Sequence, residues 1–288
     1  MPLSAIPGVF RIIGASPDGD SARFYPDDPK AFAKARMRVR TNASGGAQLR
    51  LDAIDALETH YTPRSAPAPW HQPADLGKGA ASALLEMLGF TDVQRDNRGT
   101  VTSAQPESRP GYILTRFADK YGRPVSFAYS GAREGGTEEP VFLEVGEMQR
   151  SLNFQLLSVG WVYPTFYSKL YVDLRADLAR AAIEAREAKV GVWAEDRTLS
   201  GFTVSSRQQL QDELVILPKL FRRLADYLTL DEPTTVDLAG LPAFLEAKDD
   251  RLFTVPAGQA TSLDSLIHVE GQTITLTLPP EQIVFLEA

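Results

Sequence analysis

The sequence contains no cysteine among its 288 residues. Disulfide bonds, zinc sites with thiolate ligands and thiol nucleophiles are therefore excluded. Histidine is also scarce, because only His60, His71 and His268 are present and no HExxH spacing occurs. These absences direct the search for chemistry to carboxylates and arginines.

Long apolar runs are missing as well. No stretch approaches the roughly 18 residues of a membrane span, so no membrane partner is expected. The start, MPLSAIPGVFRII, has no basic segment followed by a long apolar run, which is unlike a signal peptide. We therefore expect a cytoplasmic protein, although this pattern leaves export open.

Positive charge is in short supply, because the net charge is −7. This balance argues against a generally basic nucleic-acid binder. From Arg197 onward there are 7 Lys and Arg against 13 Asp and Glu, a net charge of −6, which leaves −1 for residues 1–196. The first two thirds of the chain can therefore still present a local basic patch.

The first 130 residues read mainly as short strands separated by turns. Hairpin-like links favour an antiparallel barrel or sandwich over a parallel sheet. A long Pro-rich segment at 59–79 is expected to be a surface insertion. The expected strands are 8–14, 20–25, 36–41, 47–54, 112–118 and 123–129, and the expected helices are 79–89, 147–159 and 172–189.

The character of the sequence changes after residue 196, so we predict a domain at 1–196 and an acidic α+β module at 197–288. A helical stretch near 206–228 should be kinked or split by Pro218. Strands are expected in the last 40 residues, with a turn at 270–272. These strands either close a separate small core or pack on a second copy of the chain as a homodimer.

Three segments combine acids with arginine or lysine. They are "DGDS" with Asp20, "RLDAIDALE" with Arg50, Asp55 and Glu58, and "DKYGRP" with Lys120, Tyr121 and Arg123. Carboxylates at strand ends suit a hard cation such as Ca²⁺, and arginines suit phosphate oxygens. A cation, two arginines and a spare carboxylate are the groups needed for phosphodiester cleavage.

Each segment alone has a simpler interpretation. Asp20 fits an ordinary turn acid after Asp-Gly, and Arg50 with Asp52 fits an exposed ion pair. Arg50 and Asp55 also have an odd offset, which puts them on opposite faces of a regular strand. They can share a site only if the chain bends between them, near Ile54.

The order and spacing of these segments resemble the staphylococcal nuclease (thermonuclease) family. The likeness continues at "LNFQLLSVGWV" (152–162) and "EAREAKVGVWAED" (184–196), and it spans about residues 8–196. It implies an α+β fold, with an OB-fold-type five-stranded β-barrel and packed helices, followed here by the smaller C-terminal α+β module.

The resemblance also implies roles for individual residues. Ca²⁺ would be held by Asp20, Asp55 and the carbonyl group of Ala56, where the family usually has threonine. Arg50, Glu58 and Arg123 would be catalytic, with the two arginines on the phosphate and Glu58 acting on the attacking water. Substrate would contact Lys120, Tyr121, Phe166 and Tyr167, the last two marking the approximate position of the aromatic platform.

The resemblance therefore predicts a Ca²⁺-dependent nuclease that cleaves DNA and RNA, preferentially single-stranded, and leaves 3′-phosphate ends. The alternative is a catalytically weak or inactive nucleic-acid or protein-binding module of the same fold. A third reading keeps the nuclease and makes the acidic module an assembly or inhibitory element.

Overall fold

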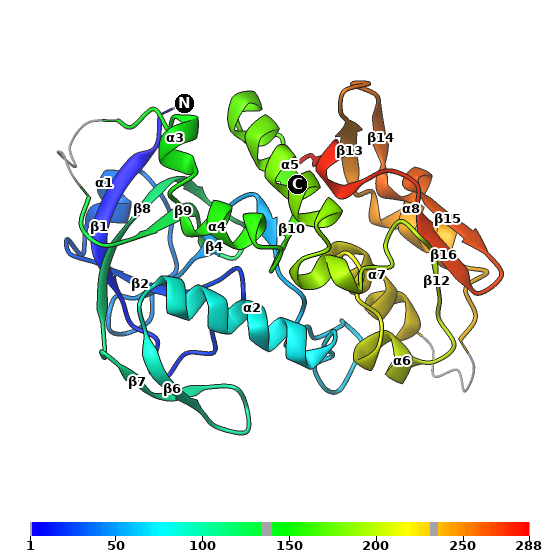
Figure 1. Cartoon of the computed structure of the whole chain (residues 1–288), viewed down its shortest axis with the longest axis horizontal. Helices are drawn as coiled ribbons and strands as arrows, with labels where there is room; N and C mark the ends of the chain where they lie inside the picture. The colour runs from blue at the N-terminus through cyan, green and yellow to red at the C-terminus, as the bar shows by residue number, and fades with distance from the viewer. Residues whose placement is uncertain (1, 134–139, 231–235, 288) are drawn as a thin grey trace. The chain divides into compact units, whose positions relative to one another are not determined.

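The computed structural model describes residues 2–133, 140–230 and 236–287. The fold is mixed α+β, and the chain divides into two compact units (Figure 1). Unit 1 comprises the chain up to Asp52 together with Ala80–Leu156, and unit 2 comprises Ala53–Gly79 together with the chain from Leu157 onward. Within the described ranges, no helix has the length and apolar character needed to cross a membrane.

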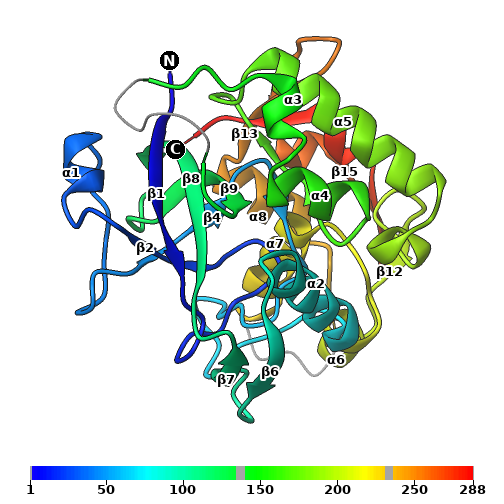
Figure 2. The same ribbon diagram turned by 60° about the vertical axis from the view of Figure 1, so that its left-hand side comes forward.

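Unit 1 is built on a six-stranded sheet that nearly closes into a barrel (Figures 1 and 2). The edge strands β3 and β4 are separated in the sequence by Leu49 alone, so one short segment pairs with both sides of the sheet. The predicted α+β class with a barrel is confirmed at this level. The strand order is β3 (Ala47–Gln48), β2 (Arg23–Pro26), β1 (Ser4–Phe10), β8 (Arg109–Ala118), β9 (Pro124–Ser130) and β4 (Arg50–Leu51).

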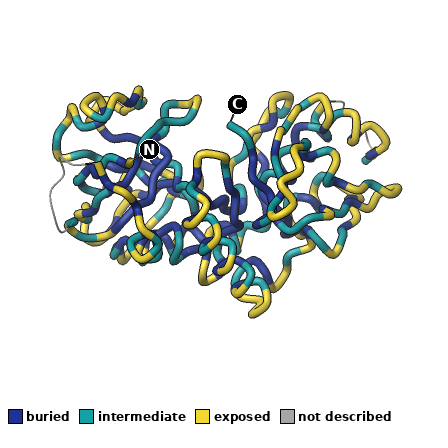
Figure 3. The backbone as a smooth tube through the Cα atoms, turned by 90° about the horizontal axis from the view of Figure 1, so that it is seen from above, coloured by how far each residue is buried: buried dark blue, intermediate teal, exposed yellow. Residues whose placement is uncertain are grey.

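The interior of unit 1 is apolar. Phe10 and Phe24 come from neighbouring strands, are fully buried, and meet edge to face with ring centroids 5.1 Å apart. Buried residues are drawn dark blue in Figure 3. All residues of β9 (Pro124–Ser130) except Ser130 are buried, so this strand is covered on both of its faces. Unit 1 also contains α1 (Ala31–Lys34), α3 (Val145–Met148) and the β6–β7 hairpin (Thr91–Arg95 and Val101–Gln105), while α2 (Ala74–Met87) and α4 (Leu152–Ser158) contain the boundaries between the units.

A buried asparagine holds the end of strand β4 in place. The Asn153 side chain donates to the carbonyl groups of Asp52 (2.8 Å) and Ser126 (3.0 Å), and it accepts from the amide of Ala128 (3.0 Å). Asp52 is the last residue before the chain turns at Ala53, where φ is +69°. The bend expected near Ile54 therefore occurs one residue earlier, and Asn153 pairs the backbone groups beside it.

Replacing Asn153 with alanine would remove this partner from the carbonyl group of Asp52 and the amide of Ala128, whereas the carbonyl group of Ser126 still accepts from the amide of Asp52 at 2.9 Å. Each unpaired buried group costs about 1–3 kcal/mol. We expect Asn153→Ala to lower the free energy of unfolding by at least about 2 kcal/mol, measured by urea denaturation. Asn97→Ala, at an exposed turn, is the control and should change little. Equal effects of the two substitutions would contradict this role of Asn153.

Unit 2 combines small sheets with helices. Its long helix α5 (Val172–Glu187) was predicted at 172–189, and it buries Leu174, Leu178, Ala181, Ala182 and Ala185. The sheets are β5 (Ile54–Asp55) with β10 (Tyr163–Pro164), the four-stranded β11 (Phe166–Tyr167), β17 (Ile283–Phe285), β13 (Arg251–Thr254) and β14 (Ala260–Ser262), and the three-stranded β12 (Phe202–Thr203), β16 (Thr273–Leu276) and β15 (Ile267–Glu270). The remaining α-helices are α6 (Arg207–Asp212), α7 (Pro218–Leu228) and α8 (Leu241–Lys248).

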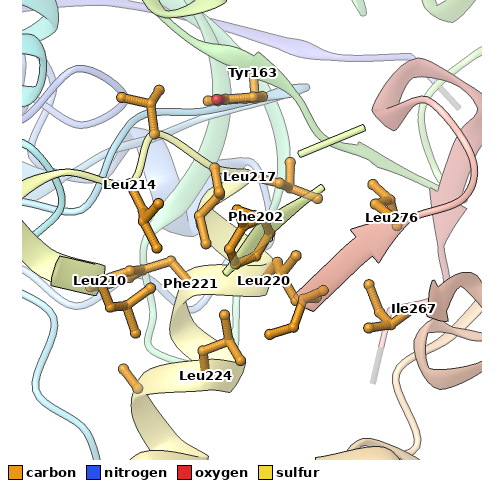
Figure 4. Close-up of a cluster of buried hydrophobic side chains, with 14 of the residues drawn as sticks. Tyr163, Phe202, Leu210, Leu214, Leu217, Leu220, Phe221, Leu224, Ile267 and Leu276 are labelled. Atoms are coloured by element: carbon orange, nitrogen blue, oxygen red, sulfur yellow. The ribbon is translucent and has the colours of Figure 1, made fainter. Parts of the chain in front are cut away.

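The described part of residues 197–288 shares a buried cluster with residues that precede it. This cluster joins Leu57, Tyr163 and Trp193 to the helices and strands of the C-terminal segment. Figure 4 shows part of this cluster around α7. A bidentate ion pair between Arg186 of α5 and the buried Glu281 (2.6 and 2.7 Å) adds a polar contact. The boundaries of the two units therefore lie elsewhere than at residue 196.

Several predicted elements differ in detail from those observed. Residues 36–40 lie within the described part of the chain and form no strand, because Arg36 follows α1 with φ +57°. The helix expected at 147–159 is two helices, because the Ser151 hydroxyl accepts from the amide of Phe154 and starts α4 anew. The split at Pro218 is confirmed, with proline as the first residue of α7.

Unit 2 also contains a largely buried cluster of three charged side chains, Lys219, Arg223 and Asp250. Asp250 accepts from Lys219 (2.9 Å) and from Arg223, and both cations come from α7. Burial alone would raise the pKa of Asp250, but Arg223 and Lys219 outweigh it and lower the pKa from 3.8 to about 2. Ionised Asp250 therefore stabilises the fold above its ordinary pKa, and this contribution is lost as the pH falls through about 2.

We expect Asp250→Asn to be less stable than the wild type at neutral pH. The difference in unfolding free energy should be nearly constant down to about pH 4 and should shrink toward about pH 2. Urea denaturation at several pH values measures it. Asp249→Asn, at the exposed neighbouring position, should show no such pH-dependent loss. A difference that stays constant from neutral pH to pH 2 would count against the assignment.

Candidate functional site

The turn between β8 and β9 is fixed by one carboxylate. Asp119 accepts from the amides of Tyr121 and Arg123, each at 2.9 Å, and from Nε of Arg123 at 2.7 Å. Gly122 has φ +79°, and its carbonyl group accepts from the amide of Arg40 at 2.9 Å. The "DKYGR" segment is thus a rigid turn that brings the Arg40 backbone against it.

A groove of about 400 Å³ lies beside this turn, entirely within unit 1. Its described lining includes three arginines and two side-chain amides but no Asp or Glu. Tyr121 stands at this groove with 63% of its surface exposed, and the Arg123 guanidinium lies 5.5 Å from its ring centroid. The lining residues are Arg23, Arg40, Thr41, Asn42, Gly46, Gln48, Tyr121, Gly122 and Arg123.

Other predicted residues of unit 1 lie near the same strands. Asp20 precedes β2, and its carbonyl group accepts from the amide of Leu51 at 2.8 Å, which places it beside the strand that carries Arg50. Arg50 pairs with Val125 in the parallel β4–β9 ladder. Lys120 is beside Tyr121, with its Nζ 5.4 Å from the ring centroid. The backbone thus brings the "DGDS" segment to the Arg50 strand, and Arg123 and Tyr121 to the groove.

Asp55 and Glu58 share a single arginine in unit 2. Asp55 is on β5, is 2% exposed, and receives both terminal nitrogens of Arg222, at 2.7 and 3.2 Å. Nη1 of Arg222 also donates to the carboxylate of Glu58. Arg222 belongs to α7, 167 residues away from Asp55 in the sequence. We call these three residues the Arg222 cluster.

The electrostatics of this cluster are mutually reinforcing. Burial alone would lower the pKa of the Arg222 guanidinium, but the carboxylates of Asp55 and Glu58 outweigh it, so that the pKa is raised. Arg222 is therefore charged under all ordinary conditions, and its bidentate geometry on Asp55 is the strong form of such a pair. The two carboxylates have a permanent cation.

The Arg222 cluster does not fit the predicted calcium site. Both oxygens of Asp55 already accept from a guanidinium, and Ca²⁺ would have to take at least one of them. The same cation occupies the carboxylate of Glu58, the predicted base. Among the described residues, no group of three or more His, Cys, Asp or Glu side chains is arranged to hold a metal ion. No catalytic step through calcium is derived from this arrangement.

The segment at 59–79, whose last residues begin helix α2, is attached to the C-terminal segment and is not a simple surface insertion. Gln72 is buried and accepts from the amide of Glu58 (3.1 Å), while its side chain donates to the carbonyl group of Ile216 (2.8 Å). The Tyr61 hydroxyl donates to Asp226 of α7 (2.9 Å). These bonds hold Glu58 and α7 in one arrangement.

Phe166 and Tyr167 lie on β11, which pairs in parallel with the C-terminal strand β17. Phe166 is fully buried, so it presents no face to a base in this structure. Tyr167 is half-buried, with its ring centroid 6.0 Å from that of Phe285. Ala56 is buried next to Asp55.

Sequence reasoning missed Arg222 and Gln72. The pair Arg222–Arg223 within an amphipathic helix rich in leucine is a signal, because arginines beside a buried face need acidic partners. Nothing in the spacing identifies those partners, since they lie more than 150 residues away.

No protein-family model matches the chain, and no curated protein matches it at a significant level. The likeness to the staphylococcal nuclease family therefore rests on the motifs quoted above.

We expect Asp55→Asn to lower the free energy of unfolding by roughly 3–5 kcal/mol, because it leaves a buried arginine with one carboxylate in place of two. Chemical denaturation measures this loss. Asp75→Asn, an exposed change in the same unit, is the control. A loss no larger than that of the control would show that the Arg222 pairing contributes nothing to stability.

Proposed function

We propose that the protein binds single-stranded nucleic acid through the basic groove of unit 1. The observation that supports this most strongly is the lining of the groove, which contains Arg23, Arg40 and Arg123 but no Asp or Glu among its described residues. Of the three, Arg123 is paired with Asp119 beside the groove. The chain as a whole carries a net charge of −7, so this concentration of arginine is local and unusual within it.

The chemistry of the groove suits a sugar-phosphate chain with unpaired bases. Guanidinium groups pair with phosphate oxygens. The side-chain amides of Asn42 and Gln48 shape the groove through hydrogen bonds within the protein, to Tyr25 and to Ser21. The exposed Tyr121 ring offers a surface on which a base can stack. An OB-type five-stranded barrel, counting residues 47–51 as one strand, is the finer fold that we propose for unit 1, and such barrels often bind oligonucleotides.

The second candidate is the Ca²⁺-dependent nuclease. It is supported by the motif resemblance and by the grouping of Arg123 and Tyr121 at one groove, with Lys120 beside them. The Arg222 cluster weighs against it, because the predicted base Glu58 and the predicted ligand Asp55 are both paired with a buried cation. We therefore place binding before catalysis.

Binding is tested by fluorescence anisotropy with a labelled single-stranded oligonucleotide in EGTA. The double variant Arg23→Ala/Arg40→Ala should bind more weakly, and its slope of log K against log salt should fall by about 1–2, because up to two phosphate contacts are lost. Arg98→Ala/Arg180→Ala removes the same charge at exposed positions and should leave the slope nearly unchanged.

Tyr121→Ala should weaken binding by roughly 1–3 kcal/mol if a base stacks on the ring. Equal salt slopes for the wild type and Arg23→Ala/Arg40→Ala would rule out the groove. The nuclease candidate is tested in parallel by adding Ca²⁺ to the same complex. Cleavage that disappears in Glu58→Gln and Arg123→Ala, but not in Arg98→Ala/Arg180→Ala, would restore it.

A further inference from the structure

The Arg222 cluster brings two carboxylates to one cation, and that cation is a guanidinium. Two carboxylates converge on one positive group, and Asp55 presents both of its oxygens to it. The guanidinium uses both terminal nitrogens on Asp55 and shares one with Glu58. Side-chain exposure is 3% for Asp55 and 20% for both Arg222 and Glu58, so the charges meet largely away from water.

Two negative charges held this close would repel each other strongly without a cation between them. This repulsion can be neutralised by a divalent ion with oxygen ligands or by an arginine guanidinium. In this structure the guanidinium of Arg222 neutralises it. Because the same carboxylate oxygens serve both solutions, the arginine and a metal exclude each other at Asp55.

Arg222 is carried by a helix that is integral to unit 2. Leu220, Phe221 and Leu224 of α7 are fully buried in the hydrophobic cluster (Figure 4). Gln72 further ties the segment before α7 to the backbone of Glu58. Withdrawing the helix would expose this core, so Arg222 is a fixed part of the fold and not a reversible cap.

We propose that Arg222 is the resident cation of Asp55 and Glu58, so that its guanidinium takes the place in which Ca²⁺ was expected and the wild-type protein binds no Ca²⁺ there. This inference does not depend on nucleic-acid binding, because it concerns unit 2 and the groove lies in unit 1.

The first test is a calcium titration of the full-length wild type by isothermal titration calorimetry, with Asp55→Asn as the reference. We expect the wild type and Asp55→Asn to give the same heats on addition of calcium. We also expect the same thermal unfolding midpoint, Tm, in EGTA and in about 10 mM CaCl₂, a concentration above the weakest calcium affinities of protein modules. Stoichiometric binding in the wild type that is lost in Asp55→Asn would overturn the proposal.

The second test removes the guanidinium. Arg222→Gln keeps similar length and hydrogen bonding but removes the guanidinium charge from both carboxylates, so its Tm should fall in EGTA and rise by several degrees on adding Ca²⁺. Arg222→Lys is the matched control, because it retains a positive charge and should show no Ca²⁺-dependent rise. The double variant Asp55→Asn/Arg222→Gln should also lose the response.

Recovery of folded Arg222→Gln in Ca²⁺ but not in EGTA would support the proposal in the same way. A folded Arg222→Gln protein whose Tm ignores Ca²⁺ would overturn it, since the arginine would not then be standing at a metal position. If Arg222→Gln folds in neither condition, the wild-type titration decides. Anisotropy of the wild type in EGTA reports on the groove separately, so failure of one proposal leaves the other standing.

Discussion

The pairing of Arg222 with Asp55 and Glu58 is the constraint on which unit 2 depends. Burying a carboxylate such as Asp55 without a partner would cost several kcal/mol. The partner comes from a helix far along the chain, so residues 53–79 and 218–228 must fold together. The hydrogen bonds from Gln72 to Ile216 and from Tyr61 to Asp226 also join these two parts of the chain.

The arginines at the groove of unit 1 have different surroundings from Arg222. Its arginines remain beside a cavity, where their charge is available to a ligand. Arg123 is partly committed to Asp119, which orients it without enclosing it. A cation that neutralises buried acids stabilises a fold, whereas cations grouped beside an open groove attract anions over a longer range. Arg222 is a cation of the first kind, and the arginines at the groove are of the second kind.

Much of the fold could be predicted from the sequence because it depends on local patterns. The strands around 112–118 and 123–129, helix α5, the break at Pro218 and the turn at 270–272 all follow from periodicity and from proline or glycine. The strand expected at 36–41 failed because its alternating arginines mimic a strand while Arg36 takes a left-handed backbone conformation.

The candidate site was less accessible from the sequence. The motifs identified Asp55 and Glu58 as a pair with a cation, but a local motif carries no information about a partner on a distant helix. The same limit applies to Phe166, whose burial depends on strand β17 near the end of the chain. Long-range pairing decided both cases.

The position of β17 within its sheet has a consequence for the order in which the protein is assembled. This strand lies between β11 and β13, so the sheet is incomplete until Ile283–Phe285 has been synthesised. The residues of unit 1 end at Leu156, so all of them are synthesised before this strand. Asp55 and Glu58 likewise precede α7, so they meet Arg222 only after about 160 further residues have been added.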